Sequence, residues 1–423
     1  MQLGAFDVVH LTALAVLAAT GLYLLLLLFG SLRASAVVAR TGEQERAYFR
    51  ARTEEILARS RAEQERSELS WNGFRKFEVA EKHEEVPGVC SFYLRPHDKR
   101  PLPPFLPGQY LTFKLDIPGQ QKDTIRCYSL SDAPNPDYFR VTIKKVPPPR
   151  NEPDAPWGLS SSFFHEQLEE GDILDVKAPS GKFYLDTATQ TPVVLIGGGV
   201  GITPVLSMLN AVTNAASKRE VWFFLGVRNK SEHPMKEHLE ALAREHENLH
   251  LNICYSDPTD ECREGVDYQH DGRVNVELFK TLLKTNNYGF YFCGPPPMMD
   301  ALKDELEDWG VPKDRINYEA FGGGTIKKLQ HPASTAGAGD IQVTFTRSDK
   351  KVNWNPSVGS LLDFAEENGV AIDFGCRAGN CGTCKTAIQA GEVDYLGTPG
   401  EQPEEGSCLV CLCVPKTNLE LDA

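Results

Sequence analysis

The sequence lacks any long block of lysine and arginine, and its 58 acidic against 44 basic residues give a formal net charge of -14 over 423 residues. Because proteins usually bind a phosphate backbone through a basic stripe, its absence argues against nucleic acid as a partner. The composition, 41% hydrophobic and 24% charged, also lacks the biases of a fibre or a disordered chain. The length predicts roughly two to four compact domains.

Asp, Glu, Lys and Arg are absent from Val8 to Leu32. A helix of that length, at ~1.5 Å per residue, exceeds the ~30 Å hydrocarbon thickness of a bilayer. We therefore expect residues 1–33 to form a single transmembrane anchor. A cleaved signal peptide is the alternative, although no basic residue precedes the long apolar run. The positive-inside rule places the downstream domains in the cytoplasm, because arginines follow the run at Arg33, Arg40, Arg46, Arg50 and Arg52.

Proline is absent from the next segment, residues 34–70, which is rich in Glu, Arg, Gln and Ala. Glu55 and Arg59 stand at a favourable helical spacing. This segment predicts a charged helical spacer. Its apolar stripe is thin, which favours a solvated stalk over a coiled coil and leaves dimerisation open.

Three further units follow from changes in pattern. Residues 71–190 contain short alternating apolar and polar stretches separated by Pro and Gly, which predicts an antiparallel β-barrel. Residues 191–322 alternate buried-strand runs with helical patterns, which predicts an α/β domain. Residues 323–339 are rich in small residues and read as a linker. A last, short unit occupies 340–423, so the fold class is multidomain, α/β and all-β.

Cysteine is unevenly distributed: six of the eleven cysteines fall in the last 48 residues. An odd number of cysteines cannot all pair in disulfides within one chain, which favours a reducing compartment. Cys376, Cys381 and Cys384 have four and two residues between them, the plant-type [2Fe-2S] ligand spacing. A zinc site is the alternative, but the first spacing departs from paired short zinc knuckles. We expect Cys376, Cys381, Cys384 and Cys411 to be the metal ligands.

The surroundings of these cysteines resemble the β-grasp ferredoxin domain. Ile341, Val343 and Phe345 alternate as in a strand, and a helical pattern from 360 to 368 stops at Gly369. Cys408 and Cys413 flank the fourth ligand position. Cys411 is preferred because a proline, Pro415, follows it as in plant-type ferredoxins.

Three segments of the barrel form an ordered set: Arg126-Cys-Tyr-Ser-Leu130, then Thr142-Ile-Lys-Lys-Val146, then Gly158-Leu-Ser-Ser161 at a helix start. Together they resemble the flavin-binding barrel of the ferredoxin–NADP reductase superfamily. The resemblance implies that Arg126 pairs with the flavin phosphate, that Tyr128 packs on the isoalloxazine and that Ser129, a catalytic residue, hydrogen-bonds near N5. The remaining expected flavin-binding residues are Lys144, Gly158, Ser160 and Ser161.

The α/β domain carries Gly197-Gly-Gly-Val-Gly-Ile-Thr-Pro204 between a buried strand and a helix, with Thr203 suited to cap that helix and Pro204 to its first turn. Cys293-Gly-Pro-Pro-Pro-Met-Met299 closes another buried strand. Each alone has a structural explanation, a tight turn or a core cysteine. Together they resemble the nicotinamide site of the same superfamily, which implies a catalytic Cys293 and dinucleotide binding by Gly197, Gly198, Gly199, Gly201, Thr203, Pro204, Cys293, Gly294 and Pro295.

The resemblance also places Phe321, near the end of the α/β domain, beside the flavin. Arg228 and Lys230 stand where a 2′-phosphate of NADPH would lie, but Glu232 opposes that charge. We therefore expect NADH, with NADPH as the alternative. We expect FAD as the flavin, with FMN as the alternative.

A hydride carries two electrons and a [2Fe-2S] cluster accepts one, so an intervening flavin resolves the mismatch. The module order, flavin then nicotinamide then ferredoxin, is similar to that of oxygenase reductases of the phthalate dioxygenase reductase type. We therefore expect electrons to pass from NADH through FAD and the cluster to an oxygenase, desaturase or similar acceptor protein. The alternatives are an electron-entry subunit of a quinone-linked respiratory complex and a non-enzymatic redox-sensing scaffold. In the sodium-pumping quinone reductase the ferredoxin unit comes first, which argues against that identity.

Overall fold

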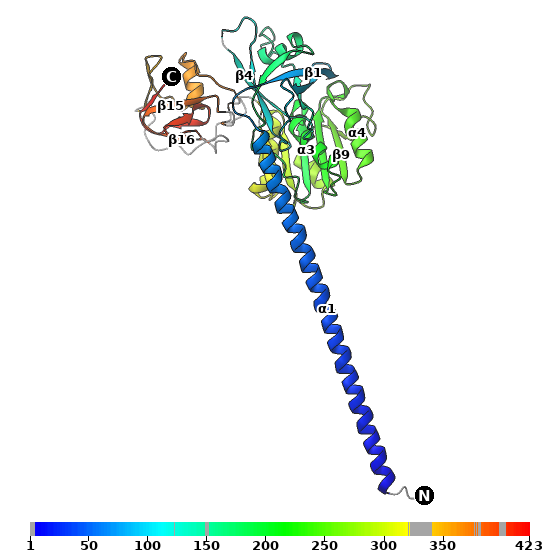
Figure 1. Cartoon of the computed structure of the whole chain (residues 1–423). Coiled ribbons are helices and arrows are strands. Elements are labelled where there is room, and N and C mark those ends of the chain that lie inside the picture. The colour runs from blue at the N-terminus through cyan, green and yellow to red at the C-terminus, as the bar shows by residue number, and fades with distance from the viewer. Residues whose placement is uncertain are drawn as a thin grey trace. The chain divides into compact units, whose positions relative to one another are not determined.

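The computed structural model describes residues 5–121, 123–148, 152–319, 321, 341–375, 377, 379, 382–396 and 403–423 (Figure 1). The chain divides into two compact units, Met1–Glu65 and Arg66–Ala423. The predicted linker at 323–339 lies outside the described residues.

One long helix, α1 (Ala5–Leu69), forms the first unit and covers both the predicted anchor and the predicted spacer. Within α1, residues His10–Arg33 have a mean hydropathy of 2.4 and are long and apolar enough to cross a membrane. The helix continues through the segment rich in Ala, Glu, Arg and Gln, which are strong helix formers. The helical character of both segments is confirmed.

The flavin-type unit is an antiparallel six-stranded sheet in the order β4-β3-β6-β1-β2-β5. A bridge between Leu130 and Val141 joins the end of β4 to β5 and so links the two edges of the sheet, as a barrel requires. Its interior is packed with aromatic and aliphatic side chains, among them Phe77, Phe113 and Phe164. Its elements are β1 (Arg75–Val86), β2 (Val89–Pro96), β3 (Tyr110–Leu115), β4 (Thr124–Ser129), β5 (Phe139–Lys144), β6 (Ile173–Val176), α2 (Leu159–Ser162) and a π-helix, η1 (Phe163–Gln167).

The α/β unit is a parallel sheet in the order β10-β9-β8-β7-β11-β12. Helices α3 and α4 contribute to the hydrophobic core on one face, and α5 and α6 to the core on the other. The strands are β7 (Val193–Gly198), β8 (Val221–Val227), β9 (Leu249–Tyr255), β10 (His270–Asp271), β11 (Gly289–Cys293) and β12 (Ile316–Glu319). The helices are α3 (Ile202–Asn214), α4 (Lys236–Glu245), α5 (Val276–Leu282), α6 (Pro296–Asp308) and the 3₁₀ turns η2 (Gly199–Gly201), η3 (Lys230–Glu232) and η4 (Lys313–Arg315).

The last unit is a mixed five-stranded sheet in the order β14-β13-β19-β15-β17 with a separate β16-β18 pair, packed on one helix. Ser360 caps that helix through a reciprocal capping box with Asp363, and Gly369 follows it at a φ of 65°. The predicted helix start and stop are confirmed. The elements are β13 (Gln342–Phe345), β14 (Lys350–Asn353), α7 (Leu361–Glu367), β15 (Lys385–Ala390), β16 (Val393–Tyr395), β17 (Ser407–Leu409), η5 (Val410–Leu412), β18 (Cys413–Pro415) and β19 (Leu419–Leu421).

Candidate functional site

Three site residues lie in one row at the carboxyl edge of the parallel sheet. Gly197 on β7 is the register partner of Cys293 on β11, and Cys293 is in turn the partner of Glu319 on β12. This edge is where open parallel sheets bind ligands, because helix N-termini and strand-to-helix loops gather there. The two predicted nicotinamide segments, about ninety residues apart in the sequence, are therefore neighbours in the fold.

Ser129 connects this row to the barrel. The Ser129 hydroxyl donates a hydrogen bond to the Glu319 carboxyl at 3.2 Å, so the predicted flavin and nicotinamide residues meet at one point. Burial raises the pKa of Glu319 to about 8, and the serine hydrogen bond offsets only part of that shift. Burial also raises the pKa of the Cys293 thiol well above its ordinary value. Both shifts favour the uncharged forms of these two groups.

The glycine loop of β7 packs against the chain that follows β11. A Cβ atom on Gly201 would lie 2.3 Å from the carbonyl oxygen of Cys293, and one on Gly198 would lie 2.8 Å from Pro295. Only glycine permits this approach, and the bare backbone is the surface that a dinucleotide pyrophosphate needs. The loop thus fits the predicted dinucleotide.

The predicted cap of α3 is wrong. The helix N-cap is Gly201, with no side-chain hydrogen bond, and Thr203 lies one residue inside the helix start at Ile202. Its hydroxyl donates to the Val200 carbonyl at 3.1 Å instead. Pro204 is in the first turn, as predicted. The tight 3₁₀ turn over Gly199–Gly201 starts the helix earlier than the Thr-Pro pair suggests. The amide groups of the first turn stay available to an anion.

Tyr128 of β4 rests against the barrel core through the edges of Phe113 and Phe164, with ring centroids 5.7 and 5.1 Å away. Phe164 lies in the π-helix that follows α2, so the flavin-facing strand and the predicted phosphate loop share one aromatic support. Arg126 lies two residues before Tyr128 on β4, and burial lowers the pKa of its guanidinium. A partly buried cation of this kind suits an anionic partner.

The loop at Gly158 separates the predicted roles of its serines. The Ser161 hydroxyl accepts from the Val146 amide at 3.0 Å and donates to the Gly158 carbonyl at 2.9 Å, so it shapes the loop. The Ser160 hydroxyl is buried and has no hydrogen-bond partner among the described residues. A buried hydroxyl without a partner costs free energy. A flavin phosphate at this helix start would satisfy it, so this loop fits the predicted cofactor.

Lys144 and the predicted 2′-phosphate cations are engaged with acids. The Lys144 ammonium lies 3.2 Å from Glu232, which joins the barrel to the α/β unit. Arg228 pairs with Glu232 at 3.7 Å and with Asp257 at 2.8 Å. Lys230 lies 3.2 Å from the buried carboxylate of Asp267. These contacts do not require a phosphate, and the flavin-binding role of Lys144 stays a prediction.

Two of the four predicted cluster ligands lie among the described residues. The sulfur atoms of Cys384 and Cys411 are buried and 3.0 Å apart, so the fold brings these two predicted ligands together. Cys376 and Cys381 lie outside the described residues. Hydrogen bonding to Cys408 and burial raise the pKa of the Cys413 thiol well above its ordinary value. The thiol arrangement fits a cluster held by Cys411.

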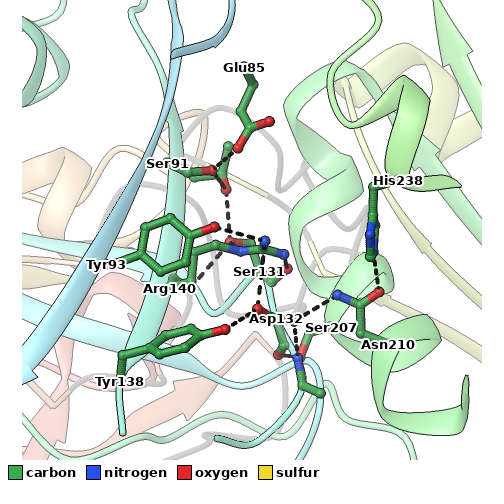
Figure 2. A network of polar contacts seen from close by, with 12 residues as sticks. Glu85, Ser91, Tyr93, Ser131, Asp132, Tyr138, Arg140, Ser207, Asn210 and His238 are labelled. Carbon is green, nitrogen blue, oxygen red and sulfur yellow. Dashed lines mark hydrogen bonds and ion pairs between the residues drawn. The ribbon is translucent and has the colours of Figure 1, made fainter. Parts of the chain in front are cut away.

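Sequence reasoning missed a group of polar residues between the barrel and α3. Asp132, three residues beyond Ser129, receives hydrogen bonds from Asn210 and, at its carbonyl, from Ser207 (Figure 2). The only sequence signal was the position of Asp132 directly after the flavin motif. Phe321, which the resemblance placed beside the flavin, is 38% exposed.

The raised pKa of Glu319 predicts a pH-dependent stability. Between about 4.5 and about 8 the folded chain holds a proton that the unfolded chain has lost, so this contribution is complete below pH 4.5 and disappears as the pH rises through 8. Glu319→Gln should flatten the fall in chemical-denaturation stability between pH 6 and 9, whereas the exposed Glu247→Gln should not. An unchanged pH profile in Glu319→Gln would show that the carboxyl is ionised in the folded state.

Comparison with known proteins gives three matching family models: the oxidoreductase FAD-binding domain over residues 76–184, the oxidoreductase NAD-binding domain over 195–304 and the 2Fe-2S iron-sulfur cluster binding domain over 343–416. The chain is 42% identical over 255 residues to the flavohemoprotein of Bacillus thuringiensis subsp. konkukian, a match that covers 60% of this chain and 62% of the relative. It therefore spans about three fifths of the length of such relatives.

Two solved structures extend the comparison. The flavohem-like FAD/NAD binding domain of nitric oxide dioxygenase from Vibrio cholerae is 30% identical, with a TM-score of 0.52, and the match covers 59% of this chain and all of that one. Phthalate dioxygenase reductase shares the fold over 83% of this chain and 98% of its own length, at 24% identity and a TM-score of 0.52. The chain belongs to the ferredoxin–NADP reductase superfamily of FAD- and NAD-binding oxidoreductases, joined here to a C-terminal plant-type [2Fe-2S] ferredoxin domain.

Proposed function

We propose that this chain oxidises NADH and delivers the electrons one at a time, through FAD and the [2Fe-2S] cluster, to a protein acceptor. The observation that carries the proposal is the row Gly197, Cys293 and Glu319, joined to the barrel by Ser129. Because these four residues lie at one junction, they support a nicotinamide and a flavin meeting there. Bound flavin supplies the chemistry that converts a two-electron donor into a one-electron source.

The residues of this chain bind and orient the two cofactors and keep negative charge away from the reacting atoms. The raised pKa values of Cys293 and Glu319 favour their uncharged forms, which do not oppose transfer of a negative hydride across this junction. Tyr128 has a fixed ring orientation against Phe164. Ser129 is oriented by its hydrogen bond to Glu319, which supports a positioning role for it near the flavin.

The first prediction concerns the electron path. Anaerobic NADH should bleach the flavin of the purified full chain and then produce the electron paramagnetic resonance signal of one reduced cluster per chain. Cys411→Ser should abolish that signal and leave flavin bleaching intact, because only the last carrier is removed. The matched control, Cys408→Ser, should retain both. A wild-type chain with bound flavin that neither NADH nor NADPH bleaches would refute the reductase function and favour the redox-sensing scaffold.

A second prediction concerns the choice of NADH. Glu232 and Asp257 occupy the cations that could otherwise bind a 2′-phosphate. The double substitution Glu232→Gln and Asp257→Asn should lower the KM for NADPH by roughly tenfold, within the ~1.5–3 kcal/mol scale of a charge-assisted hydrogen bond, and leave the KM for NADH nearly unchanged. Glu277→Gln, on the distant helix α5, is the control. Wild-type turnover that is faster with NADPH would contradict the assignment.

The acceptor and the membrane complete the proposal. The module order supports an oxygenase, a desaturase or a membrane redox complex as acceptor, and the apolar part of α1 supports a single span that keeps the redox domains on the cytoplasmic face. Such an anchor would confine the reductase to the surface where an integral acceptor diffuses. This confinement raises the local concentration of the pair.

The third prediction tests this anchor. The full chain should stay in the membrane pellet during alkaline carbonate extraction, whereas a chain that begins at Arg66, the boundary of the second compact unit, should be soluble. Both should reduce an artificial electron acceptor at similar rates. Carbonate release of the full chain would show that α1 lies outside the bilayer.

A further inference from the structure

A polar network joins the barrel to helix α3 just beyond the end of strand β4 (Figure 2). Its centre is Asp132, in the loop between β4 and β5. One carboxylate oxygen of Asp132 accepts from the side-chain amide of Asn210 at 2.7 Å, and the other accepts from the Tyr138 hydroxyl at 3.0 Å. The carbonyl of Asp132 accepts from the Ser207 hydroxyl at 2.6 Å. Both atoms of the α/β unit in these bonds belong to α3.

The network is buried on both sides of the junction. The side chain of Asp132 is 17% exposed, and Ser207 and Asn210 are almost fully buried. Ser207 and Asn210 stand three residues apart and so share one face of α3. The Nε2 of His238 on α4 donates to the Asn210 amide oxygen at 2.8 Å, which fixes the orientation of that amide. Each polar atom of this contact therefore has a defined partner.

Arg140 supports Asp132 from within the barrel. Its guanidinium lies 3.6 Å from the Asp132 carboxylate and also bonds the carbonyl of Ser131, the preceding residue. Arg140 is 8% exposed, so its charge would be costly to bury without the carboxylate. The loop that follows Ser129 is thus held in one conformation by the barrel before α3 contacts it.

An apolar contact between α3 and the barrel does not fix direction. Met208 of α3 approaches the barrel loop so closely that a Cβ on Gly108 would lie 2.5 Å from the methionine methyl group. Methionine adapts to small shifts, and burial of apolar area is non-directional. Hydrogen bonds of 2.6–2.7 Å to a carboxylate and a carbonyl do depend on direction. The register of α3 against the barrel therefore depends on Asp132.

The connection from Asp132 to α3 has one end near the proposed flavin site and the other near the proposed dinucleotide site. Asp132 lies three residues after Ser129, and α3 starts directly after the Gly199–Gly201 turn that fits the dinucleotide phosphates. We propose that Asp132 is a positioning residue: through Asn210 and Ser207 it sets the distance between the bound nicotinamide and the flavin. The proposal rests on the proposed function. In that reaction the C4–H bond of the dihydronicotinamide breaks, and its hydrogen and electron pair form the N5–H bond, so that nicotinamide is oxidised and flavin reduced.

The test compares three variants of the full chain loaded with its cofactors. Asp132→Asn and Asn210→Ala should each slow flavin reduction by saturating NADH roughly 10- to 100-fold, because a displacement of about 1 Å has effects of that order. The reduction should keep a full primary isotope effect with NADH deuterated at the transferred position, and the Kd for NADH should change by less than about threefold. Their effects should not add in the double variant.

Asp98→Asn is the matched control. Asp98 pairs with another buried arginine of the barrel, Arg75, at 2.6 Å, but both residues lie within the barrel. This variant should match the loss of stability without slowing flavin reduction. Ser207→Ala, which removes a single hydroxyl, gives a milder second variant should Asp132→Asn fold poorly. Equal slowing in Asp98→Asn, or wild-type flavin reduction in both Asp132→Asn and Asn210→Ala, would overturn the proposal.

Amide hydrogen exchange provides a readout that does not depend on turnover. Asp132→Asn should increase exchange both in residues 130–138 and in α3, whereas Asp98→Asn should leave α3 unchanged. Protection of α3 that is unaffected by Asp132→Asn would also refute the positioning role. This comparison stays decisive if the wild-type chain proves inert toward both nucleotides, an outcome that would refute the proposed function alone.

Discussion

The strictest requirement on this structure is the short distance of hydride transfer, because the two reacting atoms must approach to ~3–3.5 Å. The cofactors that carry these atoms are expected on the barrel and on the parallel sheet, which pack separately. The barrel and the parallel sheet have distinct hydrophobic cores. Neither core can specify the distance between ligands across the junction, since apolar packing tolerates sliding. Directional contacts must supply that precision.

Two such contacts hold the end of strand β4. Ser129 bonds Glu319 on the edge strand β12, and Asp132 bonds Asn210 on helix α3. The two partners belong to different elements of the α/β unit, so the strand end is fixed at two separate points. A single contact would leave rotation about every axis through it, whereas two contacts leave only rotation about the line that joins them. Strand β4 is thereby oriented as well as attached.

Much of this site follows from the sequence because its residues obey local rules. Gly197 and Gly201 are dictated by close approach to backbone and Gly199 by its positive φ of 52°, and Cys293 ends a strand whose neighbour is set by parallel topology. The connection from Asp132 to Asn210 obeys no local rule. It joins residues 78 positions apart, and hydrophobic patterning shows which faces are buried without showing which buried polar groups pair. The prediction that Thr203 caps α3 was wrong because the 3₁₀ turn over Gly199–Gly201 shifts the helix start.

The two carboxyl groups at this junction illustrate how neighbours assign function. Asp132 faces the Arg140 guanidinium, the Asn210 amide and the Tyr138 hydroxyl, so it is surrounded by groups that stabilise a negative charge. Glu319 receives one hydroxyl donor, and burial raises its pKa to about 8. A charge-stabilised carboxylate can hold two elements together, whereas a neutral carboxyl beside the hydride path avoids repelling it. Exchanging their surroundings would weaken the attachment and add a negative charge where a hydride must cross.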